Sequence, residues 1–347
     1  MSDLNVSDLK VADQEPLLKV RDLTKSFRVP GAKNSLTALD GINLDLARGE
    51  TLGLVGESGC GKSTLARTLL MLERPESGSV SFDGIDPFTL KGKELLSFRR
   101  RVQMVFQDPY ASLNSRMTAG EIIAEPWRTH KTLYKTRKDR QLRVRGLLDL
   151  VGLGAKAEGK YPQEFSGGQR QRVGIARALA LNPDVIICDE PVSALDLSVQ
   201  AQVLNLLNEL QQQLQISYIF ISHDLSVVRH VADRVSVMYL GRIIESGATE
   251  SVFDRANHPY TTALMSAAPK LNVAQRKEKI ILKGEIPSPL NPPSGCRFRT
   301  RCWKATDVCA TTRPPLVLDT AGKGHRAECF HPMQEESSQE HASALSV

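Results

Sequence analysis

The stretch GESGCGKS at residues 56–63 decides the fold expected of this 347-residue chain, because it fits the phosphate-binding pattern G-x-x-x-x-G-K-[ST]. The apolar run at 51–55 predicts a buried strand before it, and residues 64–70 predict a helix after it. A glycine-rich turn between a strand and a helix points backbone N–H groups at one spot, where the helix N-terminus favours an anion. Lys62 can reach the β- and γ-phosphates of a nucleotide, and the Ser63 hydroxyl can ligate Mg²⁺.

A second chemical signal is the apolar run VIICDE at 185–190, which ends in two carboxylates. In phosphate-loop ATPases such a strand lies beside the phosphate-loop strand, and we expect the same arrangement here. Asp189 would hold the Mg²⁺ shell, and Glu190 would polarise the attacking water from hydrogen-bonding distance. The alternative is that both acids only favour the start of a helix. The phosphate loop in the same chain favours the catalytic interpretation.

A second glycine-rich element, FSGGQRQR at 165–172, predicts another anion site at the N-terminus of a helix. Two phosphate sites in one chain are unusual for a single ATP. The pair makes sense if the second site serves ATP bound to another subunit.

Predicted strands and helices alternate along the chain, which indicates an α/β fold with a parallel sheet and helices on its faces. The strands of this pattern are at 51–55, 102–107, 184–189 and 218–222, and its helices are at 168–180, 198–214 and 225–232. Further strands are expected at 17–27, 36–45 and 80–83 and in a hairpin at 235–239 and 242–246, with further helices at 120–127 and 138–151.

Composition narrows the class of protein. A hydrophobic content of 41% and a charged content of 24% are ordinary for a soluble globular protein. The net charge is +6, but lysine and arginine are dense only at 131–145, where no aromatic residues interleave them as single-stranded nucleic acid would require. The chain has no run of about 18 apolar residues and no secretory pattern at its start, so we expect a cytoplasmic protein unless a partner holds it at a membrane.

With these motifs in order, residues 17–247 resemble the ATP-binding subunit of an ATP-binding-cassette (ABC) transporter. The resemblance implies a phosphate-loop ABC ATPase core with a parallel sheet, an antiparallel β subdomain and a helical subdomain. It also implies catalytic roles for Lys62, Gln107, Glu190 and His223, and Mg²⁺ contacts from Ser63, Gln107 and Asp189. The residues implied to bind ATP are Phe27, on which adenine would stack, Gly56, Glu57, Ser58, Gly59, Cys60, Gly61, Lys62, Ser63 and Thr64, the signature Ser166, Gly167, Gly168 and Gln169, and Asp196.

The C-terminal part of the sequence indicates which group of ABC ATPases the chain resembles. Gly241-Arg242, HPYT at 258–261, PSP at 287–289 and PPSGCRF at 292–298 resemble ATPases of oligopeptide and dipeptide importers, and most closely their second, F-type subunit. This resemblance implies that ATP hydrolysis powers peptide uptake from the cytoplasmic face of the inner membrane. It implies as partners a different ABC ATPase subunit, two transmembrane permease subunits and, indirectly, a periplasmic or extracellular substrate-binding protein, with no nucleic acid.

The sequence is also compatible with other functions. The same role could serve an importer of nickel, a glycoside or a murein peptide. A soluble ABC ATPase acting on nucleic acid or ribosomes would usually carry a long coiled coil or two cassettes, and neither is evident. A non-catalytic regulatory cassette is disfavoured because Glu190, His223 and the signature are intact.

Four segments are expected on this basis. Residues 1–16 form a flexible N-terminus, and 17–250 form the nucleotide-binding domain, with the helical subdomain at about 112–165. Residues 251–333 form a small C-terminal extension, rich in proline and with little regular structure. Residues 334–347 are polar and are expected to be disordered.

Four of the six cysteines lie in that extension, spaced Cys-x5-Cys-x6-Cys-x19-Cys at Cys296, Cys302, Cys309 and Cys329. In a cytosolic chain such a cluster favours a metal over disulfides. Four thiolates suit Zn²⁺ or a four-iron cluster, and the family resemblance favours a [4Fe-4S] cluster, with zinc and no metal as the alternatives. Its role would be structural.

Overall fold

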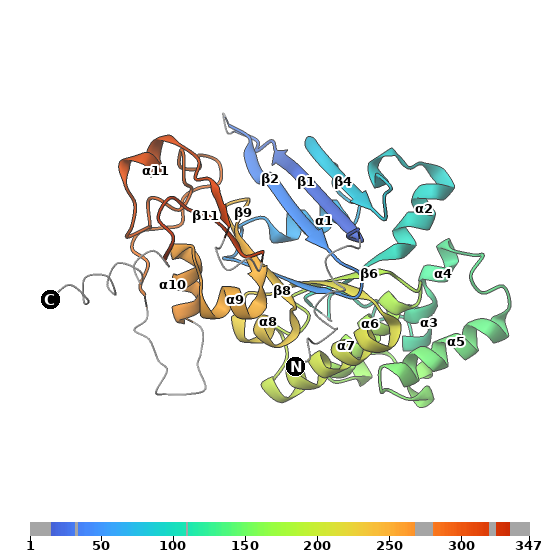
Figure 1. The fold of residues 1–347 in the computed structure, drawn as a ribbon. Helices are drawn as coiled ribbons and strands as arrows, with labels where there is room; N and C mark the ends of the chain where they lie inside the picture. Colours follow the sequence, from blue (N-terminus) through green and yellow to red (C-terminus); the bar gives the residue numbers. More distant parts are fainter. Residues whose placement is uncertain (1–14, 32–33, 109, 268–279, 319–323, 334–347) are drawn as a thin grey trace, which may run out of the picture.

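The structure is a computed structural model that describes residues 15–31, 34–108, 110–267, 280–318 and 324–333. Most of the expected flexible N-terminus and the whole expected disordered tail lie outside these residues. Figure 1 shows a central sheet, a smaller sheet beside it, a group of helices at one end and a C-terminal region at the other.

The central sheet has eight strands in the order β10-β11-β9-β8-β3-β7-β6-β5. The strands β5, β6, β7, β3 and β8 run parallel, and β9 joins β8 antiparallel. The predicted α/β fold with a parallel sheet is therefore confirmed. The bounds are β3 Thr51–Val55, β5 Val102–Val105, β6 Val185–Asp189, β7 Ser217–Ile221, β8 Arg234–Tyr239 and β9 Arg242–Ala248.

Strands at the centre of this sheet are buried along their whole length, as every residue of β3 and β7 is. Continuous apolar runs are typical of parallel strands covered on both faces. The covering helices are α1 Lys62–Leu69, α2 Gly92–Arg101, α6 Gly167–Leu179, α7 Leu197–Leu214 and α8 Leu225–Val231.

A second, antiparallel sheet of three strands has the order β2-β1-β4. Its strands are β1 Leu18–Phe27, β2 Leu36–Leu46 and β4 Ser77–Phe82. Leu18, Leu44 and Val80 of this sheet share one apolar core with Leu52 of β3 and Leu65 of α1. The small sheet therefore packs over the start of the phosphate-loop helix.

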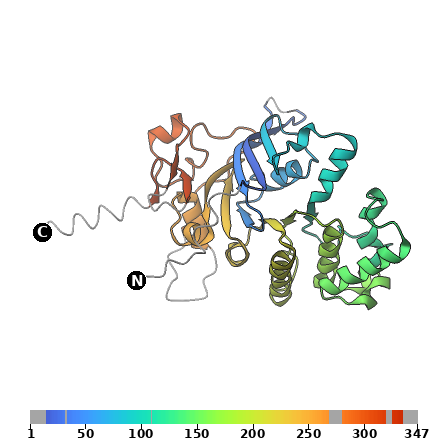
Figure 2. The same ribbon diagram turned by 45° about the vertical axis from the view of Figure 1, so that its right-hand side comes forward.

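A helical region lies at the end of the molecule opposite the C-terminal region, as Figures 1 and 2 show. It contains α3 Ala119–Ala124, α4 Pro126–Thr129, α5 Arg137–Leu150 and the short helices η3 Ala155–Gly159 and η4 Pro162–Glu164. Trp127 is fully buried there, and its indole N–H donates to the Ala180 carbonyl at 2.9 Å. This bond ties the helical region to the end of α6.

The C-terminal region is joined to the central sheet more closely than expected. It contains α9 Thr249–Asp254, α10 Pro259–Ala267, α11 Asp307–Thr311, β10 Leu316–Leu318 and β11 Arg326–Glu328. β11 pairs antiparallel with β9, with Ala327 opposite Glu245. β9 would otherwise leave an open sheet edge, and two three-residue strands of the C-terminal region fill it.

A short 3-10 helix, η2 Pro87–Thr89, lies between β4 and α2. Within the described residues, the helices are all too short or too polar to cross a bilayer.

Gly53 in β3 offers a test of the packing beneath the phosphate loop. A Cβ at this position would lie 2.5 Å from Val228 Cγ1 and 3.1 Å from Ala232 Cβ. We expect Gly53→Ala to lower the free energy of unfolding by about 1–3 kcal/mol, because the buried strand cannot move away from α8. Urea unfolding of the full chain measures this.

Gly146→Ala is the matched control. Gly146 is exposed on α5, and a Cβ there meets no atom within 4 Å. This substitution should raise the free energy of unfolding by up to about 1 kcal/mol, because alanine favours a helix. Equal effects of the two substitutions would contradict the packing assigned to β3.

Candidate nucleotide-binding site

The phosphate loop joins β3 to α1 and is pressed against neighbouring backbone. Gly56 has φ 155° and Gly61 has φ 111°. A Cβ on Gly56 would overlap the Met238 carbonyl oxygen, and one on Gly61 would overlap that of Ala38. Only glycine permits both the dihedral angles and the close approach, which is why the loop sequence folds in this way.

Lys62 lies at the first position of α1 with its ammonium group inside the loop. Its side chain is only 8% exposed, and Nζ donates to the carbonyl oxygens of Gly56 at 2.7 Å and Glu57 at 3.0 Å. Ser58, Gly59 and Ser63 are exposed, so the loop opens to solvent on this side. The Lys62 ammonium group therefore lies at the base of a loop whose other side is open to solvent.

Asp189 ends β6 close to this loop. Burial and then the neighbouring Glu190 raise the pKa of the Asp189 carboxyl, whereas Lys62 and a hydrogen bond from Ser63 lower it. β7 lies between β3 and β6, so the expectation that β6 adjoins the phosphate-loop strand is wrong. Asp189 still reaches Ser63 because the carboxyl ends of parallel strands share one edge of the sheet.

Glu190 is the centre of a three-residue cluster. Gln107 Nε2 donates to Glu190 Oε2 at 2.6 Å, and His223 Nδ1 lies 2.9 Å from Glu190 Oε1. The three residues come shortly after β5, β6 and β7, which are adjacent strands. The Glu190 backbone is held at φ 46°, an uncommon conformation for a residue with a side chain. The sheet thus brings together three polar groups that are far apart in sequence.

The second glycine-rich element begins α6. Ser166 is the N-cap: its hydroxyl accepts from the Gln169 N–H at 3.3 Å, and Gln169 Oε1 accepts from the Ser166 N–H at 3.0 Å. This capping box holds the first turn of α6, with Gly167 and Gly168 between its two members. In Figures 1 and 2 this helix lies toward the helical region, away from α1. The two anion-type elements are therefore separate in one chain.

Two further predicted residues lie at element ends. Phe27 is the half-buried last residue of β1, and Lys25 Nζ lies 5.0 Å from the centre of its ring. Asp196 is the N-cap residue of α7. Thr64 continues α1, whereas Cys60 is buried in the loop and Cys188 in β6, where burial raises the pKa of each thiol.

Two residues that sequence analysis did not single out contact the phosphate loop. The Tyr260 hydroxyl on α10 accepts from the Glu57 N–H at 3.0 Å. Arg301 donates to both carboxylate oxygens of Glu57, at 2.8 and 3.0 Å. Tyr260 belongs to the HPYT stretch, but nothing in one sequence connects position 301 with position 57.

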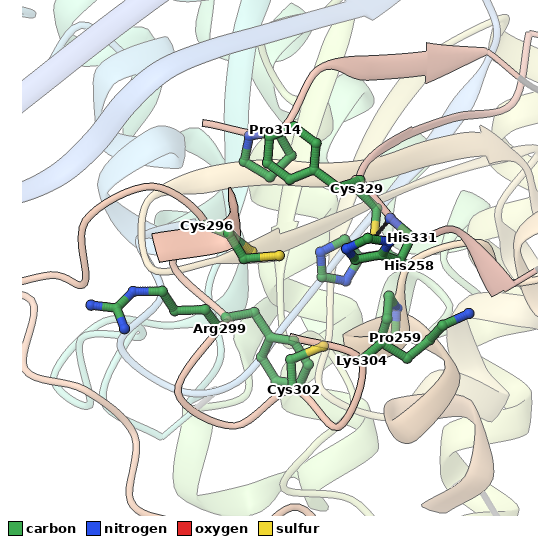
Figure 3. Close-up of a pocket in the computed structure, with 12 residues that line it drawn as sticks. His258, Pro259, Cys296, Arg299, Cys302, Lys304, Pro314, Cys329 and His331 are labelled. Atoms are coloured by element: carbon green, nitrogen blue, oxygen red, sulfur yellow. Dashed lines mark hydrogen bonds between the residues drawn. The ribbon is translucent and has the colours of Figure 1, made fainter. Parts of the chain in front are cut away.

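The four cysteines of the C-terminal region line one pocket, which Figure 3 shows. The sulfur atoms of Cys296, Cys302 and Cys329 point toward its interior, between His258 and the Arg299 segment. All four are free cysteines. The fold therefore brings these four side chains to one place although up to 33 positions separate them.

The prediction of a [4Fe-4S] cluster or a zinc ion in this pocket is wrong. Across the part of the chain that the structure describes, no group of three or more His, Cys, Asp or Glu side chains is placed to hold a metal ion. Burial raises the pKa of the Cys302 thiol to about 11 and that of Cys329 to about 12. Metal ligation needs thiolates, and these surroundings favour neutral thiols.

His258 lies at the wall of this pocket and is buried in its neutral form. Its Nδ1 accepts from the Tyr260 N–H at 3.0 Å, and its own backbone N–H donates to Glu245 at 2.9 Å. Burial lowers the pKa of His258 from 6.5 to about 3. The start of α10 therefore depends on an uncharged imidazole.

This lowered pKa predicts a pH dependence of stability. Between pH 6.5 and 3 the unfolded chain binds a proton at His258 that the folded chain does not. The free energy of unfolding should therefore fall as the pH drops below 6.5, by up to about 1.4 kcal/mol per pH unit from this group. In His258→Asn, whose carboxamide does not titrate, we expect that part of the slope to disappear.

Urea unfolding between pH 7 and 5 measures the slope. His230→Asn is the matched control, because His230 is exposed on α8. A slope that is the same in wild type and His258→Asn would contradict the assignment.

Comparison with known proteins agrees with this geometry. The ABC transporter family model matches residues 39–193, and the model of the oligopeptide/dipeptide transporter C-terminal region matches 244–309. The dipeptide transport ATP-binding protein DppF of Haemophilus influenzae is 50% identical over 327 residues, covering 93% of this chain and 98% of that protein. The oligopeptide transport ATP-binding protein AppF of Bacillus subtilis is 51% identical over 329 residues, covering 92% and 99%.

Solved structures agree as well. The ATP-binding cassette MJ0796 bound to ADP and Pi has a TM-score of 0.60 at 30% identity, covering 67% of this chain and 98% of that one. CbiO1 from Clostridium perfringens has a TM-score of 0.61 at 30% identity, covering 70% and 92%.

These matches also correct the type of subunit that the sequence had led us to expect. The expectation of an F-type ATPase subunit is wrong, because F-type ATPases are a different family and both family models that match belong to transporters. The chain belongs to the ABC transporter ATP-binding proteins, in the group that carries the oligopeptide/dipeptide C-terminal region.

Proposed function

We propose that this chain is the ATP-binding and ATP-hydrolysing subunit of an importer that takes up dipeptides or oligopeptides. The observation that carries the proposal is the cluster of Gln107, Glu190 and His223 at the edge of the sheet that also presents the phosphate loop. Relatives that share half of its residues over nearly the whole chain are named as dipeptide and oligopeptide transport ATP-binding proteins.

ATP would bind with its phosphates in the loop at residues 56–64. Lys62 would then exchange its bonds to the Gly56 and Glu57 carbonyl oxygens for bonds to phosphate oxygens. Phe27, at the end of β1, would stack on the adenine ring. The Ser63 hydroxyl, the Asp189 carboxylate and the Gln107 carboxamide offer the oxygen donors that Mg²⁺ prefers. Mg²⁺, when bound, would neutralise charge on the β- and γ-phosphates.

Glu190 is the proposed base that orients the attacking water. Both of its carboxylate oxygens make hydrogen-bonding contacts, Oε2 with Gln107 and Oε1 with His223. A carboxylate can accept a proton from water only when one oxygen faces that water. Each Glu190 oxygen keeps a second lone pair that can face this water, and we infer that His223 contacts the γ-phosphate.

The second anion-type element would act on a partner's ATP. Ser166–Gln169 lies away from the phosphate loop of its own chain, so head-to-tail pairing would place it against the γ-phosphate bound by a second ABC ATPase subunit, which we propose is a different chain. Asp196, which precedes α7, would lie at the same junction. The cassette MJ0796, to which this chain is similar, was solved as a dimer, which supports pairing of two such subunits.

Closure of that pair would move the helical region at residues 112–165, which we propose contacts two transmembrane permease subunits. ATP favours the closed pair through its higher affinity for that state, and this difference drives the change in the permease. The chain would then sit peripherally at the cytoplasmic face of the inner membrane, with a substrate-binding protein delivering the peptide from outside. Residues 17–250 form the proposed ATPase unit and 251–333 its extension.

Replacing the proposed base tests the catalytic assignment. Glu190→Gln should lower ATP turnover by about 10²–10⁴-fold while MgATP still binds, because the carboxamide cannot take a proton from water. Steady-state phosphate release and equilibrium MgATP binding separate the two effects. Lys62→Ala, in contrast, should no longer bind MgATP.

Glu209→Gln on the exposed face of α7 is the matched control and should leave turnover unchanged. Wild-type turnover in Glu190→Gln would remove Glu190 from the mechanism.

Purification from gently solubilised membranes tests the partners. We expect the chain to copurify with two permease subunits and a second ABC ATPase, and addition of a di- or oligopeptide with its binding protein should stimulate ATP turnover. Stimulation by nickel or a glycoside instead would replace the peptide substrate. Recovery with ribosomes or nucleic acid alone would contradict the transport function.

A further inference from the structure

Arg301 makes a two-pronged ion pair with the second residue of the phosphate loop. Its Nη1 and Nη2 donate to Glu57 Oε2 and Oε1 at 2.8 and 3.0 Å. The Arg301 side chain is 8% exposed, so this pair is largely shielded from water. The hydrogen bond to Glu57 raises the pKa of Arg301. A planar guanidinium holds both oxygens of a carboxylate in one orientation, which a lysine cannot do.

The same loop residue is held a second time through its backbone. The Tyr260 hydroxyl accepts from the Glu57 N–H at 3.0 Å. Tyr260 is fully buried, and its ring lies 4.7 Å from that of Tyr239 and 5.3 Å from that of Phe298. Phe298 precedes Arg301 by three residues, so one aromatic cluster positions both groups that hold Glu57.

Arg297 supports the other side of the loop from the same segment. It donates to Asp40 at 2.6 Å and to the Leu240 carbonyl oxygen. The next residue along, Gly241, donates its N–H to the Cys60 carbonyl oxygen at 2.8 Å. Residues 297–301 therefore hold the phosphate loop directly at Glu57 and, through the β8–β9 turn, at Cys60.

The charge of Glu57 explains why such a contact matters for an anionic ligand. A carboxylate within the loop would repel a triphosphate and would compete for the N–H groups and for Lys62. Arg301 neutralises this charge and turns the carboxylate toward the C-terminal region. The contacts with Arg301 and Tyr260 also fix the backbone of Glu57. The carbonyl oxygen of Glu57 accepts a hydrogen bond from Lys62 at 3.0 Å.

We propose that Arg301 is a positioning residue of the nucleotide site, so that the C-terminal region completes the phosphate loop without touching the nucleotide. This inference rests on the proposed function, because it assumes that the loop binds ATP. It assigns the C-terminal region a role in nucleotide affinity in addition to any role in folding.

Binding of Mg²⁺ with the non-hydrolysable ATP analogue AMP-PNP to the full chain tests the proposal by calorimetry. Arg301→Gln should weaken binding by about tenfold, because it leaves the Glu57 carboxylate unpaired within an anion site. The double variant Glu57→Gln with Arg301→Gln should return to within about threefold of wild type, because it removes that charge as well. Such rescue would not follow from a loss of packing.

Tyr260→Phe is a second, independent variant and should weaken binding by about threefold through the loss of one acceptor. Arg313→Gln is the matched control, because Arg313 pairs with Glu328 within the C-terminal region at 2.6 Å. It should bind like wild type. In turnover assays Arg301→Gln should raise the KM for ATP much more than it lowers kcat, since Arg301 does not contact the reacting atoms.

The outcomes distinguish this proposal from the proposed function. If wild type binds the analogue and Lys62→Ala does not, the nucleotide site stands. Wild-type affinity in Arg301→Gln and Tyr260→Phe, an equal loss in Arg313→Gln, or no rescue in the double variant would then overturn the role of Arg301. Failure of wild type itself to bind would overturn the proposed function instead.

Discussion

The close approach of the phosphate loop to neighbouring backbone is the constraint on which the rest of the structure depends. At Gly56 and Gly61 the loop meets the carbonyl oxygens of Met238 and Ala38, and a single extra carbon at either position would overlap them. The loop is therefore shaped by β8 of the central sheet and β2 of the small sheet together. Because both sheets must be in place before the loop has its final form, the anion site is a product of the whole core and not of a local motif.

The same sheet geometry assembles the polar cluster. Parallel strands end at one edge, so residues that follow β5, β6 and β7 meet there although more than a hundred positions separate Gln107 from His223. The contacts of Gln107 and His223 hold the Glu190 carboxylate at this edge. Each oxygen of this carboxylate keeps a second lone pair, so the same contacts that position Glu190 leave it able to accept a hydrogen bond from water.

Sequence analysis predicted the alternation of strands and helices because buried parallel strands are continuous apolar runs with sharp boundaries. It failed where that signal is weak: β10 and β11 are three residues long, and their pairing with β9 is visible only in space. The position of β7 between β3 and β6 depends on chain crossings that no local pattern specifies. The spacing of the four cysteines predicted a metal centre, but their surroundings favour neutral thiols. The contact between Arg301 and Glu57 had no signal, because nothing in a single sequence pairs positions 244 residues apart.

That separation has a consequence for how the protein is made. A ribosome synthesises a chain from its N-terminus, so residues 56–63 and the strands that shape them emerge long before Arg297 and Arg301. The phosphate loop can fold during translation, but the Glu57 carboxylate stays unpaired until the chain has been made as far as Arg301. Chains that stop before Arg301 would thus carry the phosphate loop with the Glu57 carboxylate unpaired.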